Sequence, residues 1–330
     1  MFSSHVLFLY LNDLITEFKI EMLQHQTNTN FLKKLLIPFI VFSGISLSGF
    51  SQQNITQGPA NGKLLLIGGN AEDQVFLPKF KKLLGGKDKP IVIIPTARSK
   101  ETMREEDFAE RHKKRFKKYG FTDITILHTR NREVANSKEF VKPLQKAKGV
   151  WIMGGRQWRL VDAYHNTLVH LELVGLLHRG GVIAGTSAGA TIQGSFLVRG
   201  DTQTNTIMVG DHKKSFAFIE NVAVDQHLIP RNRHFDMFEV LDQYPNLLGI
   251  GLDENTGIIV RNNTFKVIGE NYVAIYDGTR WSAERDTIYE LNKDEEQFYF
   301  LNKGDRYNLK KRHVIREDET NKKISEPEAK

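Results

Sequence analysis

Five short apolar runs, each ending in glycine or a small polar residue, constrain the fold of this chain more than any other feature. They cover residues 63–69, 91–97, 124–129, 149–155 and 181–187. Runs of this kind are typical of strands that are buried on both faces of a parallel sheet. Stretches of helical periodicity lie between them, at residues 76–84, 101–119, 138–146 and 159–178. The alternation predicts a three-layer α/β/α domain with a doubly wound, mostly parallel sheet, whose functional residues lie at the carboxyl ends of the strands.

The pattern changes after residue 260. Residues 266–278, 287–291 and 297–309 alternate polar and apolar side chains and carry turn signals, which predicts C-terminal antiparallel hairpins on the edge of the main sheet. We therefore expect a signal segment at 1–51, a linker at 52–61, an α/β domain at 62–278, a β-hairpin extension of that domain at 279–311, and a charged, disordered tail at 312–330.

The first 51 residues contain the parts of a secretory signal. Lys33 and Lys34 precede an apolar run at 35–47, and small residues, Gly49 and Ser51, occupy the −3 and −1 positions. The run is shorter than the ~20 residues that span a bilayer, so no stable membrane anchor is expected. Met22 is an alternative start, and a helix of the folded protein is the alternative interpretation of the segment. The prediction is a secreted or periplasmic protein.

Composition and residue spacing exclude several kinds of site. The chain has no cysteine, so disulfides, thiolate zinc sites and cysteine nucleophiles are impossible. The formal net charge of +7 is modest for 330 residues, and no nucleic-acid partner is expected. The histidines form no H-x-x-x-H or H-E-x-x-H pair, and the first apolar run lacks G-x-G-x-x-G, so neither a metal nor a cofactor is expected. A homodimer is left open.

A G-x-S-x-G motif ends the fifth apolar run, with its serine at Ser187. Glycines on either side of the serine allow a sharp strand-to-helix turn that presents the hydroxyl at the end of the sheet. The backbone N–H of Ala188 can then help to stabilise an oxyanion, and Gly155, at the end of the preceding strand, is a natural second donor. A glycine-rich turn of a nucleotide-binding fold is the alternative interpretation.

A serine nucleophile needs a base and an acid that orients it. A strand-like run at 221–227 ends in His227, and another at 247–254 ends in Asp253 and Glu254. His227 therefore suits the role of the base and Glu254 that of the acid, with Asp253 as the alternative acid. The order Ser…His…Glu differs from that of the α/β-hydrolases, in which the acid precedes the histidine.

Six ordered motifs make the comparison with known families more specific. They are IGGNAEDQ (67–74), IPTARS (94–99), MGGRQWRL (153–160), GTSAGA (185–190), VDQHLIPRNR (224–233) and GIGLDENTGIIV (249–260). Together they resemble the cyanophycinase branch of the S51 serine peptidases, relatives of aspartyl dipeptidase with a class I glutamine amidotransferase-like fold. The resemblance implies an exopeptidase that releases β-Asp-Arg dipeptides from cyanophycin, a polyaspartate with arginine on each β-carboxyl. It also implies Ser187, His227 and Glu254 as the catalytic residues.

The same resemblance implies a substrate pocket that contains Gln157, Asp225, Gln226, Arg231 and Arg233. Guanidinium groups can bind substrate carboxylates in bidentate fashion, and a carboxylate such as Asp225 can receive an arginyl side chain or an amine. Arginines that merely cap an exposed loop are the simpler interpretation of Arg231 and Arg233.

Two residues beside the predicted site depart from the family pattern, and both reverse a charge. Arg156, also a candidate substrate-binding residue, stands where the family has an acid, and Asp236 stands where it has a third arginine. A compensating Arg156–Asp236 pair is one explanation. Short aspartyl or isoaspartyl peptides are the alternative substrates, and a secreted binding protein without turnover is the alternative function. The basic run at 111–118 is interpreted as the solvated face of a helix, which can still attract an anionic polymer.

Overall fold

The computed structural model describes residues 55–86, 88–282, 285–292 and 295–316. The predicted signal segment, the start of the predicted linker and residues 317–330 lie outside these ranges. No helix within the described residues is long and apolar enough to span a membrane.

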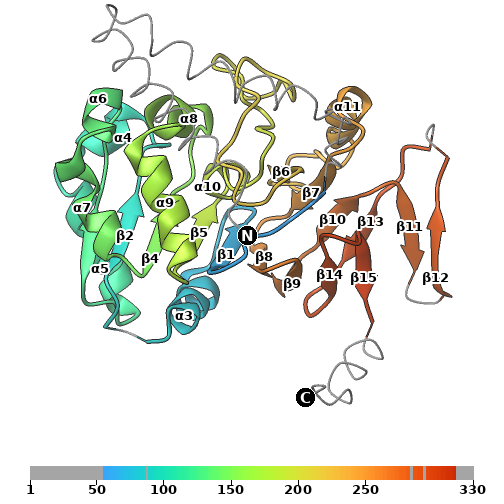
Figure 1. Cartoon of the computed structure of the whole chain (residues 1–330), viewed down its shortest axis with the longest axis horizontal. Helices are drawn as coiled ribbons and strands as arrows, with labels where there is room; N and C mark the ends of the chain where they lie inside the picture. The colour runs from blue at the N-terminus through green and yellow to red at the C-terminus, as the bar shows by residue number, and fades with distance from the viewer. Residues whose placement is uncertain (1–54, 87, 283–284, 293–294, 317–330) are drawn as a thin grey trace, which may run out of the picture. The chain divides into compact units, whose positions relative to one another are not determined.

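The central sheet has nine strands in the described part of the chain, in the order β15-β14-β9-β8-β1-β5-β4-β2-β3. Its parallel part holds the five predicted apolar runs (Figure 1): β1 (Lys63–Ile67), β2 (Ile91–Ile94), β3 (Ile124–Ile126), β4 (Gly149–Ile152) and β5 (Val182–Thr186). The antiparallel part follows β1: β8 (Thr256–Arg261), β9 (Thr264–Gly269), β14 (Arg306–Asn308) and β15 (His313–Ile315). The predicted α/β fold with a mostly parallel central sheet is confirmed.

Helices cover both faces of the parallel strands. Alternate residues of each strand face opposite sides: Leu65 of β1 and Ile93 of β2 pack with α3 (Asp73–Leu84) and α5 (Phe108–Lys118), beside α4 (Lys100–Arg104). The other residues pack with the helices of the opposite face: α6 (Arg132–Ala135), α7 (Lys138–Lys146), α8 (Trp158–Tyr164) and α9 (Leu168–His178). Figure 1 shows the two groups of helices on either side of the sheet. The result is the predicted three-layer arrangement.

A second sheet carries the later strands. It contains β6 (Val222–Gln226), β7 (Leu248–Leu252), β10 (Val273–Tyr276) and β13 (Tyr299–Leu301), in the order β13-β10-β7-β6. Strands β6 and β7 are parallel, and β10 and β13 add antiparallel neighbours. A separate hairpin joins β11 (Thr279–Ser282) to β12 (Arg285–Glu290), and α11 (Met237–Gln243) lies between β6 and β7 in the chain. The strands that end near His227 and Glu254 thus belong to a sheet other than that of Ser187.

Two predicted boundaries are wrong in part. The predicted disordered tail begins at 312, but residues 313–315 form β15, because Val314 is buried against the core and pairs with Tyr307. The predicted linker ends at 61, but the N–H of Gln57 already donates to Glu220 O at 3.3 Å, and Thr56 is buried. Both segments are short and mostly polar or charged, so the sequence pattern did not indicate that Val314 and Thr56 pack inward.

Candidate active site

Ser187 occupies a strained turn between β5 and α10 (Ala188–Thr191). Its φ of 54° and ψ of −118° lie outside the regions that side-chain-bearing residues prefer. A Cβ on Gly185 would lie 1.9 Å from Gly189 O, and a Cβ on Gly189 would lie 2.2 Å from Ile152 O. Both glycines are therefore needed for this close packing, as the motif predicted. The Ser187 N–H donates to Ile67 O at 2.8 Å, which ties the turn to the end of β1.

Three predicted side chains meet in one hydrogen-bonded series. Ser187 Oγ lies 2.9 Å from His227 Nε2, and His227 Nδ1 lies 2.6 Å from Glu254 Oε1. The Glu254 carboxylate can only accept, so Nδ1 carries the proton of the neutral imidazole and Nε2 is free to accept from the serine hydroxyl. The structure thus joins the three residues in the order that abstraction of the serine proton requires.

Asp253, the alternative acid, lies elsewhere. Its buried Oδ1 accepts the N–H of Ile229 at 3.1 Å, and burial raises the pKa of this carboxyl. Successive residues after β7 point in different directions, so Glu254 rather than Asp253 reaches the imidazole. The alternative assignment is therefore corrected in favour of Glu254.

The His227 imidazole is held at the junction of the two sheets. Its backbone has a φ of 56°, and its N–H donates to Gly68 O at 3.2 Å. A Cβ on Gly69 would lie 2.2 Å from His227 Cε1, so glycine at this position makes room for the ring. Burial lowers the pKa of His227, the hydrogen bond to Glu254 opposes that effect, and the positive charges of Arg231 and Arg233 lower the pKa further. The net shift is downward, which favours the neutral imidazole that a base must be.

The two predicted oxyanion donors border Ser187. Ala188 begins α10, and its N–H belongs to the first turn, where helix amides lack carbonyl partners within the helix. Gly155 is exposed in the turn after β4, with a φ of 149°. A Cβ on the adjacent Gly154 would lie 3.1 Å from Ser187 Cβ, so this turn passes directly beside the serine. The backbone of both predicted donors is thus next to the serine.

The predicted pocket residues divide into two groups. Gln226 Oε1 lies 3.4 Å from Ser187 Oγ, and Arg233 Nη1 donates to Gln226 O at 3.1 Å. Arg233 is buried, which lowers the pKa of its guanidinium to about 10, whereas Arg231 is exposed. Gln157 lies in the interior: its Nε2 donates to the carbonyls of Val198 and Arg199 at 2.9 Å each. Gln157 thus holds the chain segment after α10. The alternative interpretation, an exposed loop cap, is wrong for Arg233.

Asp225 is not open to a substrate. Its carboxylate accepts two bonds from Arg199, at 3.0 Å from Nε and 2.9 Å from Nη2, and both side chains are almost fully buried. Arg199 Nη2 also lies 2.5 Å from Asp236 Oδ2. No sequence signal marked Arg199, which lies in a polar segment and has a φ of 52°. The guanidinium that Asp225 binds is therefore that of Arg199, whereas the sequence suggested the arginyl side chain of a substrate.

The suggested Arg156–Asp236 pair does not form. Asp236 pairs with Arg199, and Arg156 Nη1 donates to Thr204 O at 3.1 Å. The segment 199–206 lies between them, because Arg199 Nη1 also donates to the carbonyl of Thr206 at 3.1 Å. The two charge reversals are thus satisfied separately, and the guanidinium of Arg156 makes no ion pair with any described residue.

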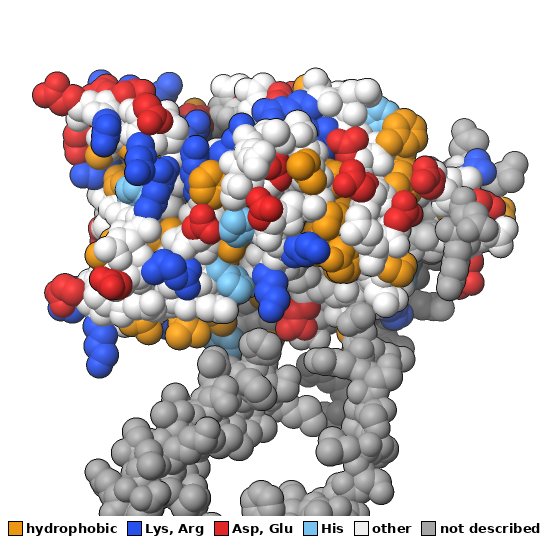
Figure 2. All heavy atoms as spheres, turned by 90° about the horizontal axis from the view of Figure 1, so that it is seen from above, with side chains coloured by type: hydrophobic (Ala, Val, Ile, Leu, Met, Phe, Trp, Pro, Cys, Tyr) orange, Lys and Arg blue, Asp and Glu red, His pale blue; other side chains and the backbone are white. Residues whose placement is uncertain are grey.

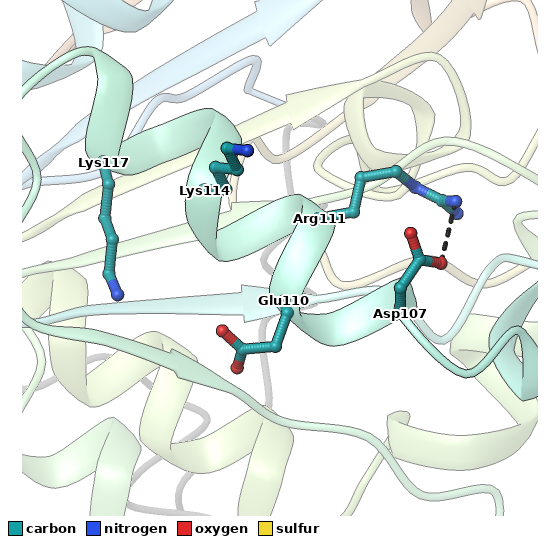
Figure 3. A pocket seen from close by; sticks show the side chains of 5 residues that line it. All are labelled: Asp107, Glu110, Arg111, Lys114 and Lys117. Carbon is teal, nitrogen blue, oxygen red and sulfur yellow. Dashed lines mark hydrogen bonds and ion pairs between the residues drawn. The ribbon is translucent and has the colours of Figure 1, made fainter.

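The basic run at 111–118 lies on α5, away from Ser187. A depression of about 500 Å³ is lined by Asp107, Glu110, Arg111, Lys114 and Lys117. Figure 3 shows these five side chains along one face of α5 and just before it. Arg111 pairs with Asp107 at 3.1 Å, and Lys113 with Glu110 at 3.0 Å. Internal pairing of this kind is typical of a solvated helix face.

Comparisons with known proteins found similar sequences and a similar fold. Residues 64–268 match the sequence profile described as "Peptidase family S51". The chain is similar to the cyanophycinase of Geminocystis herdmanii, with 32% identity over 263 residues that cover 75% of this chain and 93% of the relative. It is also similar to the cyanophycinase of a Nostoc species, with 31% identity over 265 residues that cover 76% of this chain and 87% of the relative.

A solved structure supports the fold. The crystal structure of a peptidase from an acI-B1 actinobacterium superposes with a TM-score of 0.52 and 24% sequence identity. The match covers 76% of this chain and 98% of that one.

Proposed function

Since the chain belongs to peptidase family S51, we propose that it is a serine exopeptidase that hydrolyses aspartyl peptides of the cyanophycin type through an acyl-enzyme on Ser187. The observation that carries the proposal is the series Ser187–His227–Glu254, with distances of 2.9 and 2.6 Å. An uncharged imidazole between a hydroxyl and a carboxylate is the arrangement that activates a serine.

The proposed reaction has two steps. His227 Nε2 takes the proton of Ser187 as Oγ attacks the substrate carbonyl, and the amides of Gly155 and Ala188 receive the oxyanion. His227 then gives that proton to the leaving amine, which breaks the peptide bond and leaves an ester on Ser187. A water molecule loses a proton to His227, attacks the ester and releases the acid, while Ser187 recovers its proton. Glu254 stabilises the imidazolium in both steps.

The substrate is the finer part of the proposal. Cyanophycin is the first candidate because the relatives reported above are cyanophycinases, and because Arg231, exposed beside His227, is available to a carboxylate. Short aspartyl or isoaspartyl peptides are the second candidate, favoured by one observation: Arg199 already occupies Asp225, so this carboxylate cannot also bind an arginyl side chain. A substrate panel of cyanophycin, poly-L-aspartate and α- and β-linked Asp-X dipeptides separates the two.

The replacement Ser187→Ala tests the mechanism. We expect a loss of kcat of about 10⁴-fold or more on whichever substrate of the panel is cleaved, because the variant has no nucleophile. Unchanged turnover by the purified variant would exclude the acyl-enzyme. Covalent labelling of the unmodified protein, but not of the variant, by a serine-directed probe checks the same point without the substrate and separates an enzyme from a binding protein.

Export is a separate part of the proposal. Lys33 and Lys34 before the apolar run at 35–47 support a cleaved signal and a secreted or periplasmic enzyme. Mass spectrometry of the protein recovered outside the cytoplasm measures its N-terminus. A chain that stays in the cytoplasm and begins before residue 35 would contradict export.

A further inference from the structure

Four arginines gather at the carboxyl ends of three neighbouring strands. Arg98 follows β2, Arg130 follows β3, and Arg156 and Arg159 follow β4. These strands are adjacent and parallel, in the order β4-β2-β3, so the segments that follow them meet at one end of the sheet. Figure 2 shows Lys and Arg side chains (blue) over much of the face seen from above, with Asp and Glu side chains (red) among them. We refer to Arg98, Arg130, Arg156 and Arg159 as the arginine cluster.

Backbone carbonyls, not acids, hold the arginine cluster together. Arg159 Nη1 donates to Ala97 O at 3.1 Å, and Arg130 Nη2 donates to Arg98 O. The backbone N–H of Arg156 donates to the same Ala97 O at 2.9 Å. Within the described residues, none of the four guanidinium groups has a carboxylate within ion-pair distance. The cluster is therefore a concentration of positive charge without an ion pair, and Glu101 is the acid that acts on Arg159 from a longer distance.

The cluster also has hydrogen-bond donors that are not used. Nε of Arg130 and Nε of Arg159 are buried, and neither has a hydrogen-bond partner among the described residues. Burial lowers the pKa of Arg159, and the positive charges of Arg130 and Arg156 lower it further. Uncompensated like charges destabilise a folded protein unless a ligand neutralises them. This arrangement fits an anion that is bound for part of the working cycle.

The cluster begins beside the nucleophile. A Cβ on Gly155 would lie 2.1 Å from Ala97 O, the carbonyl that Arg156 and Arg159 share, and Gly154 contacts Ser187. The turn that borders Ser187 is therefore the same turn from which the segment with Arg156 and Arg159 continues. On the opposite side, Arg199 already neutralises Asp225 and shares Asp236. The guanidinium groups of the arginine cluster are therefore the charged groups without an ion pair that a substrate can contact on this side.

We propose that the arginine cluster is a subsite that binds carboxylate groups of the peptide substrate, on the side of Ser187 that faces Gly155. The inference rests on the proposed function, since it assigns the cluster to the substrate of that same site. It identifies the substrate class as a carboxylate-rich peptide chain. Guanidinium groups bind carboxylates in bidentate fashion, which suits four planar donors on three neighbouring segments.

The test measures binding apart from turnover. In the full chain carrying Ser187→Ala, the affinity for poly-L-aspartate of defined length is measured by fluorescence anisotropy. We expect Arg98→Gln/Arg156→Gln to raise Kd roughly tenfold or more, since each lost charge-assisted contact is worth a few-fold or more in affinity. The side chain of Arg98 makes no hydrogen bond to any described residue, so its replacement leaves the fold intact. Arg159→Lys serves as a second variant: it keeps the positive charge but loses the planar guanidinium group.

The matched control removes the same two charges elsewhere. Lys114→Gln/Lys117→Gln lies in the α5 depression of Figure 3, and we expect its Kd to change less than twofold. Equal effects of the two double variants would overturn the subsite, because general attraction would then explain the binding. Inorganic polyphosphate that binds as tightly as polyaspartate, with the same dependence on Arg98 and Arg156, would also overturn it.

The outcome is distinguishable from failure of the proposed function. In one outcome, polyaspartate binds through the arginine cluster, but the unmodified protein cleaves neither polyaspartate nor any other substrate of the panel. That outcome would refute the proposed function and leave the anion-binding site. Cleavage of aspartyl peptides with unchanged affinity in Arg98→Gln/Arg156→Gln would refute the subsite and leave the function.

Discussion

At the scale of single residues, the proposed chemistry depends most on the charge of His227. The imidazole must be neutral to accept the serine proton, and its surroundings favour that state: burial and two nearby arginines lower its pKa, and the hydrogen bond to Glu254 opposes them only in part. A base whose pKa lies below the working pH is already deprotonated when the substrate arrives.

We therefore expect kcat/KM to rise with pH and to level off, with a midpoint below the ordinary histidine value of 6.5. Activity is lost as the pH falls, because protonation removes the base. Arg231→Gln removes a positive charge that lowers the pKa, so its midpoint should move to higher pH, whatever its effect on KM. The exposed Arg261→Gln is the control and should leave the midpoint in place. A midpoint that is the same in Arg231→Gln and the unmodified protein would contradict this account.

Glu254→Gln should shift the same midpoint in the opposite direction. The carboxylate raises the pKa of His227, so its loss lowers that pKa while kcat falls by about 10²- to 10⁴-fold, because the imidazolium is no longer stabilised. A pH–rate profile of the residual activity measures both effects. A purely structural role for Glu254 would reduce kcat without moving the midpoint.

The residues that the sequence could indicate are those with local signals. Ser187 has flanking glycines, and His227 and Glu254 each end an apolar run. Arg199 has no such signal: it lies in a polar segment, and its partner Asp225 is 26 residues away in the chain. Pairing at that separation depends on the path of the segment after α10, which no local pattern specifies. The roles of the substrate-pocket residues stay predictions.

At the scale of elements, the site exists because two sheets meet at the end of β1. Gly68 N–H donates to Thr256 O at 2.9 Å, Gly68 O accepts from His227, and Gly69 O accepts from Asn255 at 2.9 Å. These bonds bring the ends of β6 and β7 against the turn that carries Ser187. Nucleophile and base thus reach each other from different sheets across one short segment.

Gly69→Ala tests this junction. The new Cβ would overlap the His227 ring in a backbone with φ of 136°, so we expect kcat/KM to fall about a hundredfold as the ring is displaced, with a loss of roughly 1–3 kcal/mol in the free energy of unfolding. Gly86→Ala is the control: its φ is 145°, and nothing lies within 4 Å of its Cβ. It should cost stability without loss of activity. Equal activity losses in both variants would show that backbone strain, not contact with His227, matters.

Element boundaries were less predictable than the elements. The predicted helix at 159–178 is two helices, because Asn166 adopts a φ of 56° and Thr167 is extended. Helical periodicity continues across the break, since both helices bury leucines on the sheet. The assignment of β6 and β7 to a second sheet is equally invisible in the sequence, because a buried strand has the same apolar pattern in either sheet.

At the scale of the folded domain, residues near its two ends are tied together. Arg312 Nε and Nη2 donate to Thr56 Oγ1 at 3.1 and 2.8 Å, and Nη2 also donates to Asn246 O at 2.5 Å. Arg312 lies just before β15, in the segment predicted to be disordered. One side chain therefore joins the first described residues, the turn before β7 and the last strand of the central sheet.

Arg312→Met should lower the free energy of unfolding by about 1–3 kcal/mol, because it removes three hydrogen bonds and leaves the buried hydroxyl of Thr56 without these donors. Urea denaturation measures the change. Lys311→Met, at an exposed neighbouring position, is the control and should have an effect within roughly 0.5 kcal/mol. An equally large loss of unfolding free energy in Lys311→Met would show that the charge of the segment matters, and not the hydrogen bonds of Arg312.

The pairing of Arg199 with Asp225 and Asp236 has a consequence for how such a site can change. The Arg199 guanidinium occupies the two carboxylates that could otherwise bind the arginyl side chain of a substrate, and so blocks that binding. Arg199→Ala would leave a guanidinium-sized cavity that contains one buried and one partly exposed acid, the complement of a free arginine side chain. The test compares turnover of an arginine-bearing polymer with turnover of an arginine-free polymer, in the unmodified protein and in Arg199→Ala. A change in that ratio measures whether this one residue decides which side chain is recognised.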